Sequence, residues 1–146
     1  MSSIKNKVAV IGASGYGGMQ AIKLLSAHSV FQISYLGGDR SAGKEWNELN
    51  PFLPLKEDLV IELPDADKIS EVAEFALLSL PNGLASQITP KLIKNNTKVL
   101  DLSADYRFKS LDLWKEIYTE ENKKYFRNDY DLCNEAVYGI SEWYKS

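Results

Sequence analysis

The sequence has one cysteine and no excess of basic residues. One cysteine excludes an internal disulfide framework, and this favours the cytoplasm. A formal charge of −3 without a basic stripe makes nucleic acid an improbable partner. Apolar runs fall short of the ~18–20 residues that cross a bilayer, so we expect no membrane partner. The polar start, Met1 to Lys5, does not resemble a signal peptide.

What is present is the composition of an ordinary globular domain. Of the 146 residues, 45% are hydrophobic and 25% are charged. This length fits one domain that can bury a full core. We therefore treat residues 1–146 as a single domain without internal repeats.

A glycine-rich stretch near the start is the main functional signal. The apolar run Val8–Ile11 is typical of a buried parallel strand, and it leads into glycines at 12, 15, 17 and 18. The spacing differs by one residue from the usual dinucleotide fingerprint. The mechanism survives this change, because glycines allow a tight turn and close ligand approach before a helix N-terminus that attracts phosphate. We predict a dinucleotide site; the alternative is a turn that binds nothing.

The turn after the second predicted strand bears on the type of cofactor. The strand Phe31–Leu36 is followed by Gly37-Gly38-Asp39-Arg40-Ser41. An acid at this point would favour NAD by binding both ribose hydroxyls, whereas a guanidinium can hold a 2′-phosphate in bidentate fashion. We favour NADP, with Arg40 and Ser41 as the readers of the phosphate. Asp39 supports the opposite choice, and a solvated charged turn is the third possibility.

The rest of the chain continues the pattern of strand, turn and helix. Further strands are predicted at 60–63, 75–80 and 98–102, and helices at 16–28, 84–94 and 110–118, where Ser110 is the expected N-cap. The fold class is therefore α/β, with a Rossmann-like, mostly parallel sheet and helices on both faces. A long connection at 42–59 is expected to be anchored by four apolar residues, Trp46, Leu49, Phe52 and Leu53. The acidic stretch 57–74 is expected to be a solvated face around the short strand.

Two later turns carry polar groups at the carboxyl ends of strands, where open α/β sheets bind ligands. Leu80 ends one strand and Pro81 and Asn82 follow it, so these residues are expected near the nicotinamide end of the cofactor; the alternative is a plain turn. The next strand is followed by Ser103-Ala104-Asp105-Tyr106-Arg107. Asp105 and Arg107 are candidates for binding an anionic substrate, in which Arg107 holds a phosphate or carboxylate. Equally, these two residues could simply hold a loop together.

Two further residues are expected to have no catalytic role. His28 lies near a helix end and is interpreted as a surface residue. Cys133 has an acidic setting, which disfavours a thiolate, so we interpret it as structural or incidental.

Ten of the sixteen aromatic residues follow Ala104. This tail either wraps back over the sheet or packs on a partner, and the second alternative predicts self-association.

Three motifs together resemble the N-acetyl-gamma-glutamyl-phosphate reductases, arginine-pathway relatives of aspartate-semialdehyde dehydrogenase. These motifs are Gly12 to Gly18, Asp101 to Arg107 and Ala136 to Glu142. The third departs from the family's Tyr-Gly-Leu-Pro-Glu pattern at Ile140 and Ser141. The resemblance covers essentially the whole chain. With it, the expected cofactor-binding residues are Gly12, Ser14, Gly15, Tyr16, Gly17, Gly37, Arg40, Ser41, Leu80, Pro81, Asn82 and Ser103.

The resemblance implies an NADPH-dependent reduction of an acyl phosphate to an aldehyde. In such chemistry a cysteine thiolate attacks the acyl phosphate and hydride reduces the thioester. The family's nucleophilic cysteine and its histidine are expected beyond Ser146, so no catalytic residue and no metal site is predicted in this chain. We expect the isolated chain to bind NADP(H) without catalysis, and the full-length protein to be a homo-oligomer. The alternatives are a reductase of aspartyl or aminoadipyl phosphate, and a non-catalytic NADP-binding sensor.

Overall fold

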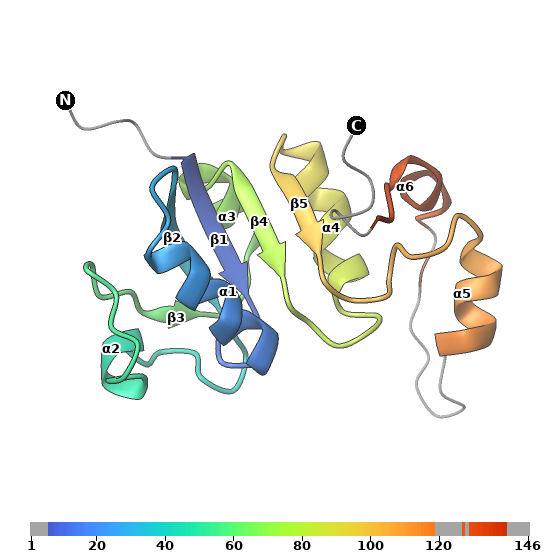
Figure 1. Ribbon diagram of the computed structural model, residues 1–146. Coiled ribbons are helices and arrows are strands. Elements are labelled where there is room, and N and C mark those ends of the chain that lie inside the picture. Colours follow the sequence, from blue (N-terminus) through green and yellow to red (C-terminus); the bar gives the residue numbers. More distant parts are fainter. Residues whose placement is uncertain (1–5, 119–126, 128, 140–146) are drawn as a thin grey trace.

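The computed structural model describes residues 6–118, 127 and 129–139. Within them, five parallel strands form one sheet in the order β3-β2-β1-β4-β5 (Figure 1). The strands are β1 (Asn6–Ile11), β2 (Phe31–Gly37), β3 (Ile61–Glu62), β4 (Phe75–Leu78) and β5 (Lys98–Asp101). Parallel neighbours require crossover connections, so strands alternate with helices along the chain. The predicted α/β fold is confirmed.

Helices cover both faces of this sheet. They are α1 (Tyr16–Ser26), α2 (Trp46–Leu49), α3 (Ala66–Val72), α4 (Ala85–Lys94), α5 (Leu111–Tyr118) and α6 (Tyr130–Glu135). Figure 1 shows α1 on one face and α3 and α4 on the other. None of the helices in the described ranges is long and apolar enough to cross a membrane.

The alternation of side chains along β1 explains the two layers of core. Val8 and Val10 pack with Ile22 of α1, whereas Ala9 and Ile11 face the layer of α3 and α4. Successive residues of a strand point to opposite faces, so an apolar run with no polar break is buried on both sides. The central position of β1 therefore follows directly from its sequence.

Several boundaries differ from the prediction. α1 ends at Ser26, two residues before His28, and the Nδ1 atom of His28 accepts the backbone N–H groups of Val30 and Phe31 at 3.0 and 3.2 Å. The histidine thus shapes the turn into β2. β4 ends at Leu78 and β5 at Asp101, because the residues that follow them turn away to form the loops at the carboxyl edge.

The connection at 42–59 holds one unpredicted element and two wrongly predicted anchors. Trp46 is completely buried and opens the short helix α2, and its Nε1 atom donates to the carbonyl of Leu53 at 2.8 Å. Phe52, in contrast, is fully exposed, and Leu49 is 40% exposed. The prediction of these two residues as anchors is wrong, because the turn around Pro51 directs the Phe52 ring into solvent and Leu49 lies at the exposed end of α2.

The acidic stretch contains a helix that the charge pattern concealed. Asp65 caps α3 by accepting the N–H groups of Asp67 and Lys68 at 2.9 and 3.2 Å. Ile69 is buried against the sheet. A good N-cap followed by an apolar residue four positions later was the available signal.

Beyond β5, the chain forms a small separate cluster. α5 and α6 pack around Leu111, Trp114 and Cys133, all completely buried. Ser110 caps α5 as predicted, since its Oγ atom accepts the N–H of Leu113 at 3.2 Å. The described part of the aromatic tail therefore has a core of its own. The last residues of the third motif, 140–142, lie outside the described residues.

Candidate functional site: the carboxyl edge of the sheet

The strand order reverses direction between β1 and β4. From β1 the chain adds β2 and β3 on one side, and then returns to place β4 and β5 on the other. Loops that leave neighbouring strands in opposite directions create a crevice at the carboxyl edge, which is where open α/β sheets bind ligands. The glycine loop after β1 and the turn after β4 border this crevice.

The glycine loop has a conformation that side chains would disrupt. Gly12 has a φ of +83°, and a Cβ atom there would overlap the carbonyl of Ser79. A Cβ atom at Gly18 would overlap the carbonyl of Gly12, so this glycine lets α1 pack directly on the loop. The loop is fixed by the N–H groups of Gly12 and Ala13, which both donate to the carbonyl of Gly37, at 2.8 and 3.0 Å. These contacts agree with the structural roles predicted for Gly12 and Gly18.

The start of α1 is open to a ligand. Its N-cap, Gly15, offers no side chain to the first-turn N–H groups, and the first turn carries no acidic residue. Tyr16 is 96% exposed at the same point. Unsatisfied N–H groups and the positive end of the helix dipole favour an anion here. The geometry is that of a phosphate cradle.

Ser79 is a site residue that the sequence reasoning missed. Its N–H donates to the carbonyl of Ile11 at 2.8 Å, which extends the pairing of β4 with β1. A Cβ atom at Gly17 would overlap the Ser79 hydroxyl, so this hydroxyl lies against the glycine loop. The available signal was its place at the carboxyl end of a buried strand that neighbours β1.

The structure brings the glycine loop and the 37–41 turn together. The Ser41 hydroxyl donates to the Ser14 hydroxyl at 3.1 Å. Gly37 packs closely on β1, since a Cβ atom added to it would lie only 3.0 Å from a methyl group of Ile11. Ser41 is buried, whereas Arg40 is exposed beside it. Two segments far apart in sequence therefore form one surface, with the exposed guanidinium of Arg40 at its rim.

The turn after β4 is tied to the loop after β5. Leu80 is half-buried against the core and Pro81 is exposed. Asn82 accepts the N–H of Ala104 through its Oδ1 atom at 3.1 Å. The amide of Asn82 is therefore partly engaged within the protein, and the turn is held across the carboxyl edge.

Ser103 makes its hydrogen bonds inside its own loop. Its N–H and hydroxyl donate to the two carboxylate oxygens of Asp101, each at 2.8 Å, and its oxygen accepts the N–H of Asp105 at 3.1 Å. Burial raises the pKa of Asp101, and the bonds from Ser103 offset only part of this effect. The contacts of Ser103 in the described structure are those of a loop-shaping residue at the end of β5.

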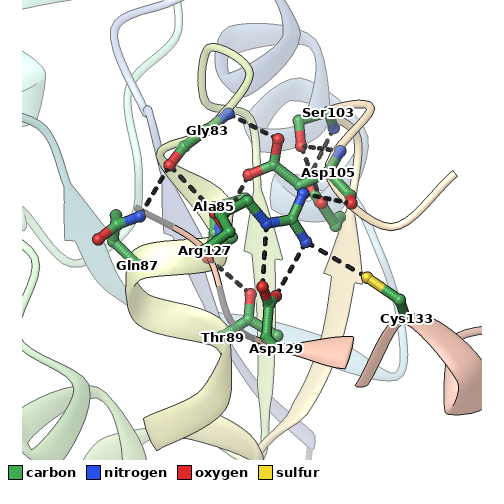
Figure 2. A network of polar contacts seen from close by, with 11 residues as sticks. Gly83, Ala85, Gln87, Thr89, Ser103, Asp105, Arg127, Asp129 and Cys133 are labelled. Atoms are coloured by element: carbon green, nitrogen blue, oxygen red, sulfur yellow. Dashed lines mark hydrogen bonds and ion pairs between the residues drawn. The ribbon is translucent and has the colours of Figure 1, made fainter. Parts of the chain in front are cut away.

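Asp105 is completely buried. One carboxylate oxygen accepts the N–H of Gly83 at 2.6 Å and the other that of Ser86 at 2.8 Å, so Asp105 caps the start of α4 from a distant loop (Figure 2). Both oxygens are occupied within the protein. This geometry favours the alternative in which Asp105 holds the loop together over a direct contact with substrate.

Arg107, in contrast, is exposed. Its Nη1 atom donates to the Tyr118 hydroxyl at 2.7 Å, and its guanidinium lies 5.8 and 5.6 Å from the ring centres of Tyr118 and Tyr138. It lines a cavity of about 490 Å³ beside the end of β5, together with Asp101 and Ser103. The position suits an anion-binding arginine held by aromatic neighbours.

Cys133 lies in the cluster of α5 and α6, where the Nη2 atom of Arg127 donates to its Sγ atom at 3.5 Å. It is completely buried, and burial raises the pKa of its thiol although the Arg127 guanidinium acts in the opposite direction. A buried, protonated thiol is a poor nucleophile. The described residues also contain no cluster of three or more groups that could hold a metal ion.

The fold and the glycine cradle together define a dinucleotide-binding domain of the Rossmann type. Comparison with known proteins agrees. Residues 7–146 match the family model for the semialdehyde dehydrogenase NAD-binding domain, so the chain belongs to this family of nicotinamide-cofactor-binding domains.

Curated relatives named N-acetyl-gamma-glutamyl-phosphate reductase include one from Prochlorococcus marinus (strain NATL1A), 57% identical over 99% of this chain and 40% of the relative. Another, from Synechococcus sp. (strain CC9605), is 49% identical over 98% of this chain and 40% of the relative. The chain thus spans about 40% of the length of these relatives.

Among solved structures, aspartate semialdehyde dehydrogenase with NADP from Candida albicans has a TM-score of 0.59 at 26% identity. This match covers 71% of this chain and 31% of that one.

Proposed function

We propose that residues 1–146 form the cofactor domain of an N-acetyl-gamma-glutamyl-phosphate reductase, and that the cofactor is NADP(H). The observation that carries the proposal is the joined surface of the glycine loop and the 37–41 turn, held by the Ser41–Ser14 hydrogen bond. The names of the relatives support the particular reductase.

The glycine loop is the proposed pyrophosphate site. Gly15 and Gly17 leave backbone N–H groups at the start of α1 uncovered, and Ser79 places a hydroxyl against the loop. Ser14 and Tyr16 are both exposed at the same edge. We infer that the N–H groups bind the phosphates while these side chains orient the two halves of the cofactor.

Arg40 is the proposed reader of the 2′-phosphate. Its guanidinium is exposed beside Ser41 and has the planar geometry that binds phosphate in bidentate fashion. Asp39, also exposed, could accept hydrogen bonds from the ribose hydroxyls of NAD, which would favour NAD over NADP. A bidentate charge-assisted contact is stronger than a neutral one, so we propose that the preference is for NADP(H).

The substrate side of the site is proposed at Arg107. An acyl phosphate carries the negative charge that this exposed guanidinium can bind beside the end of β5. A bound nicotinamide cofactor supplies hydride for reduction of the acyl group. Cys133 is too deeply buried to act as the nucleophile, so the proposed role of the described residues is binding and orientation.

Calorimetric titration of the purified chain with NADPH and NADH tests the cofactor assignment. Wild-type protein is expected to bind NADPH more tightly. Arg40→Ala removes a charge-assisted contact of about 1.5–3 kcal/mol, so NADPH binding should weaken about tenfold to hundredfold while NADH binding stays unchanged.

Lys23→Ala is the matched control, because Lys23 is an exposed cation in the last turn of α1, at the opposite end of that helix from the glycine loop. It should change neither affinity. Equal loss of NADPH and NADH affinity in Arg40→Ala would contradict a 2′-phosphate contact. Absence of NADPH binding to the wild-type chain would contradict the proposed cofactor function itself.

A further inference from the structure

Arg127 is a buried arginine with no place in the site described so far. Only 4% of its surface is exposed. Its Nε and Nη2 atoms donate to the two carboxylate oxygens of Asp129 at 3.0 and 2.9 Å. The guanidinium lies 4.4 Å from the ring centre of Trp114 and 5.1 Å from that of Tyr106. The guanidinium is therefore held both at its edge, by the Asp129 carboxylate, and over its plane, by the two aromatic rings.

Arg127 Nη2 also donates to the Cys133 Sγ atom at 3.5 Å, and the Nη1 donor connects this cluster to the carboxyl edge. Its Nη1 atom donates to the backbone carbonyl of Asp105 at 2.8 Å, while the Asp105 carboxylate caps the start of α4 (Figure 2). Asp105 is therefore fixed by hydrogen bonds at both its backbone and its side chain. Arg127 donates to its backbone carbonyl, and the N–H groups of Gly83 and Ser86 donate to its carboxylate.

The same hydrogen-bond network includes the turn after β4. Ala104, next to Asp105, donates its N–H to Asn82, and Gly83 donates to Asp105 itself. The 80–83 turn thus depends on the position of the 103–105 loop. That loop is in turn fixed by Arg127.

The adenosine end of the proposed cofactor site is held by different contacts. Ser41 bonds to Ser14, the N–H of Gly38 donates to Glu62, and Gly37 accepts from the glycine loop. These bonds lie on the β2 and β3 side of β1. Within the described residues, none of them involves the Arg127 cluster, so the two ends of the crevice are supported independently.

We propose that Arg127 is a positioning residue for the nicotinamide half of the cofactor site, acting through Asp105 on the 80–83 turn. The inference rests on the proposed NADP(H) function. Arginine is required because its planar fork satisfies Asp129 in bidentate fashion and still reaches the Asp105 carbonyl, which a lysine ammonium cannot do. Burial alone would raise the pKa of Asp129, but the hydrogen bonds and positive charge of Arg127, together with the nearby Tyr106 hydroxyl, lower the pKa overall, so the pair stays ionised.

The test compares two ligands on the same variants. NADPH occupies the whole crevice, whereas adenosine 2′,5′-bisphosphate carries the adenosine end and its 2′-phosphate without nicotinamide. The double variant Arg127→Met/Asp129→Asn removes both charges, so that no unpaired charge remains buried. Arg127→Lys keeps the charge and provides a second variant if the first does not fold. Lys115→Met is the control, because Lys115 makes a cation–π contact with Tyr130 in the same cluster without touching Asp105.

In both Arg127 variants, NADPH affinity is expected to fall by about threefold to thirtyfold, with the smaller loss in Arg127→Lys. Affinity for adenosine 2′,5′-bisphosphate should change by less than about twofold. Circular dichroism confirms that each variant is folded at the titration temperature. Equal weakening of both ligands would overturn the proposal as a general loss of structure. Unchanged NADPH affinity would overturn it as well. Failure of wild-type protein to bind either ligand would instead refute the cofactor function on which the inference rests.

Discussion

Removal of the Asp105 carboxylate should destabilise the whole domain, although this residue lies in a loop. Asp105 is 0% exposed and accepts two backbone N–H groups at the start of α4. In Asp105→Ala both N–H groups lose their acceptor in a place that water does not reach. In Asp105→Asn one oxygen remains, so one of the two bonds can persist.

The magnitude follows from the two hydrogen bonds. A hydrogen bond to a charged group contributes about 1.5–3 kcal/mol, so two of them contribute roughly 3–6 kcal/mol. Domains unfold with free energies of about 5–15 kcal/mol. Asp105→Ala should therefore remove a large part of the free energy of unfolding, and Asp105→Asn about half as much.

Urea denaturation monitored by circular dichroism measures this effect. The expected result is a lower midpoint with an unchanged dependence on urea concentration. Asp112→Asn is the matched control, because Asp112 is exposed and accepts one hydrogen bond, from Tyr130 at 3.1 Å. It should change the free energy by less than about 0.5 kcal/mol. A loss below about 1 kcal/mol in Asp105→Ala would refute the capping role.

Two further predictions concern the cluster beside β5. Cys133 is completely buried and the pKa of its thiol is raised. Iodoacetamide at neutral pH should therefore modify it at least about tenfold more slowly in the native chain than in the guanidinium-unfolded chain. Comparable rates would contradict its burial. Asp129 has a pKa lowered by Arg127, so its contribution to stability is present above the ordinary carboxyl pKa of about 4 and is lost as the pH falls through its lower folded value. Thermal unfolding at pH 6 and pH 3 should show a larger acid loss in wild type than in Arg127→Met/Asp129→Asn, and equal losses would show that the pair does not contribute.

The sheet was predictable because its signals are local. The unbroken apolar run of β1 and the turns that follow the strands indicate a parallel α/β fold. The strand order was not predictable, because the sequence does not determine on which side of β1 each crossover places the next strand. α3 was missed because its acidic composition concealed the Asp65 cap and buried Ile69. Phe52 was misplaced because burial depends on the direction of a turn, which its hydrophobicity does not determine.

The candidate site was predictable where backbone dictates it and unpredictable where distant side chains meet. Gly12 and Gly18 are required by close backbone approach, which glycine spacing reveals. The roles of Asp105 and Arg127 depend on pairing across 22 positions of sequence, and no local pattern encodes such a contact. Ser79 was missed for a related reason, since its contact with the glycine loop exists only once β4 lies beside β1.

Nitrogen-15 NMR titration of the chain with NADPH tests most directly whether the glycine loop and the 37–41 turn form one cofactor site. If they form one site, the amide signals of Gly15, Gly17 and Ser41 shift together with a single affinity, while those at the opposite edge of the sheet, such as Asn6 and Lys98, stay in place. Shifts confined to other parts of the chain, or no shifts at saturating NADPH, would contradict a shared cofactor site.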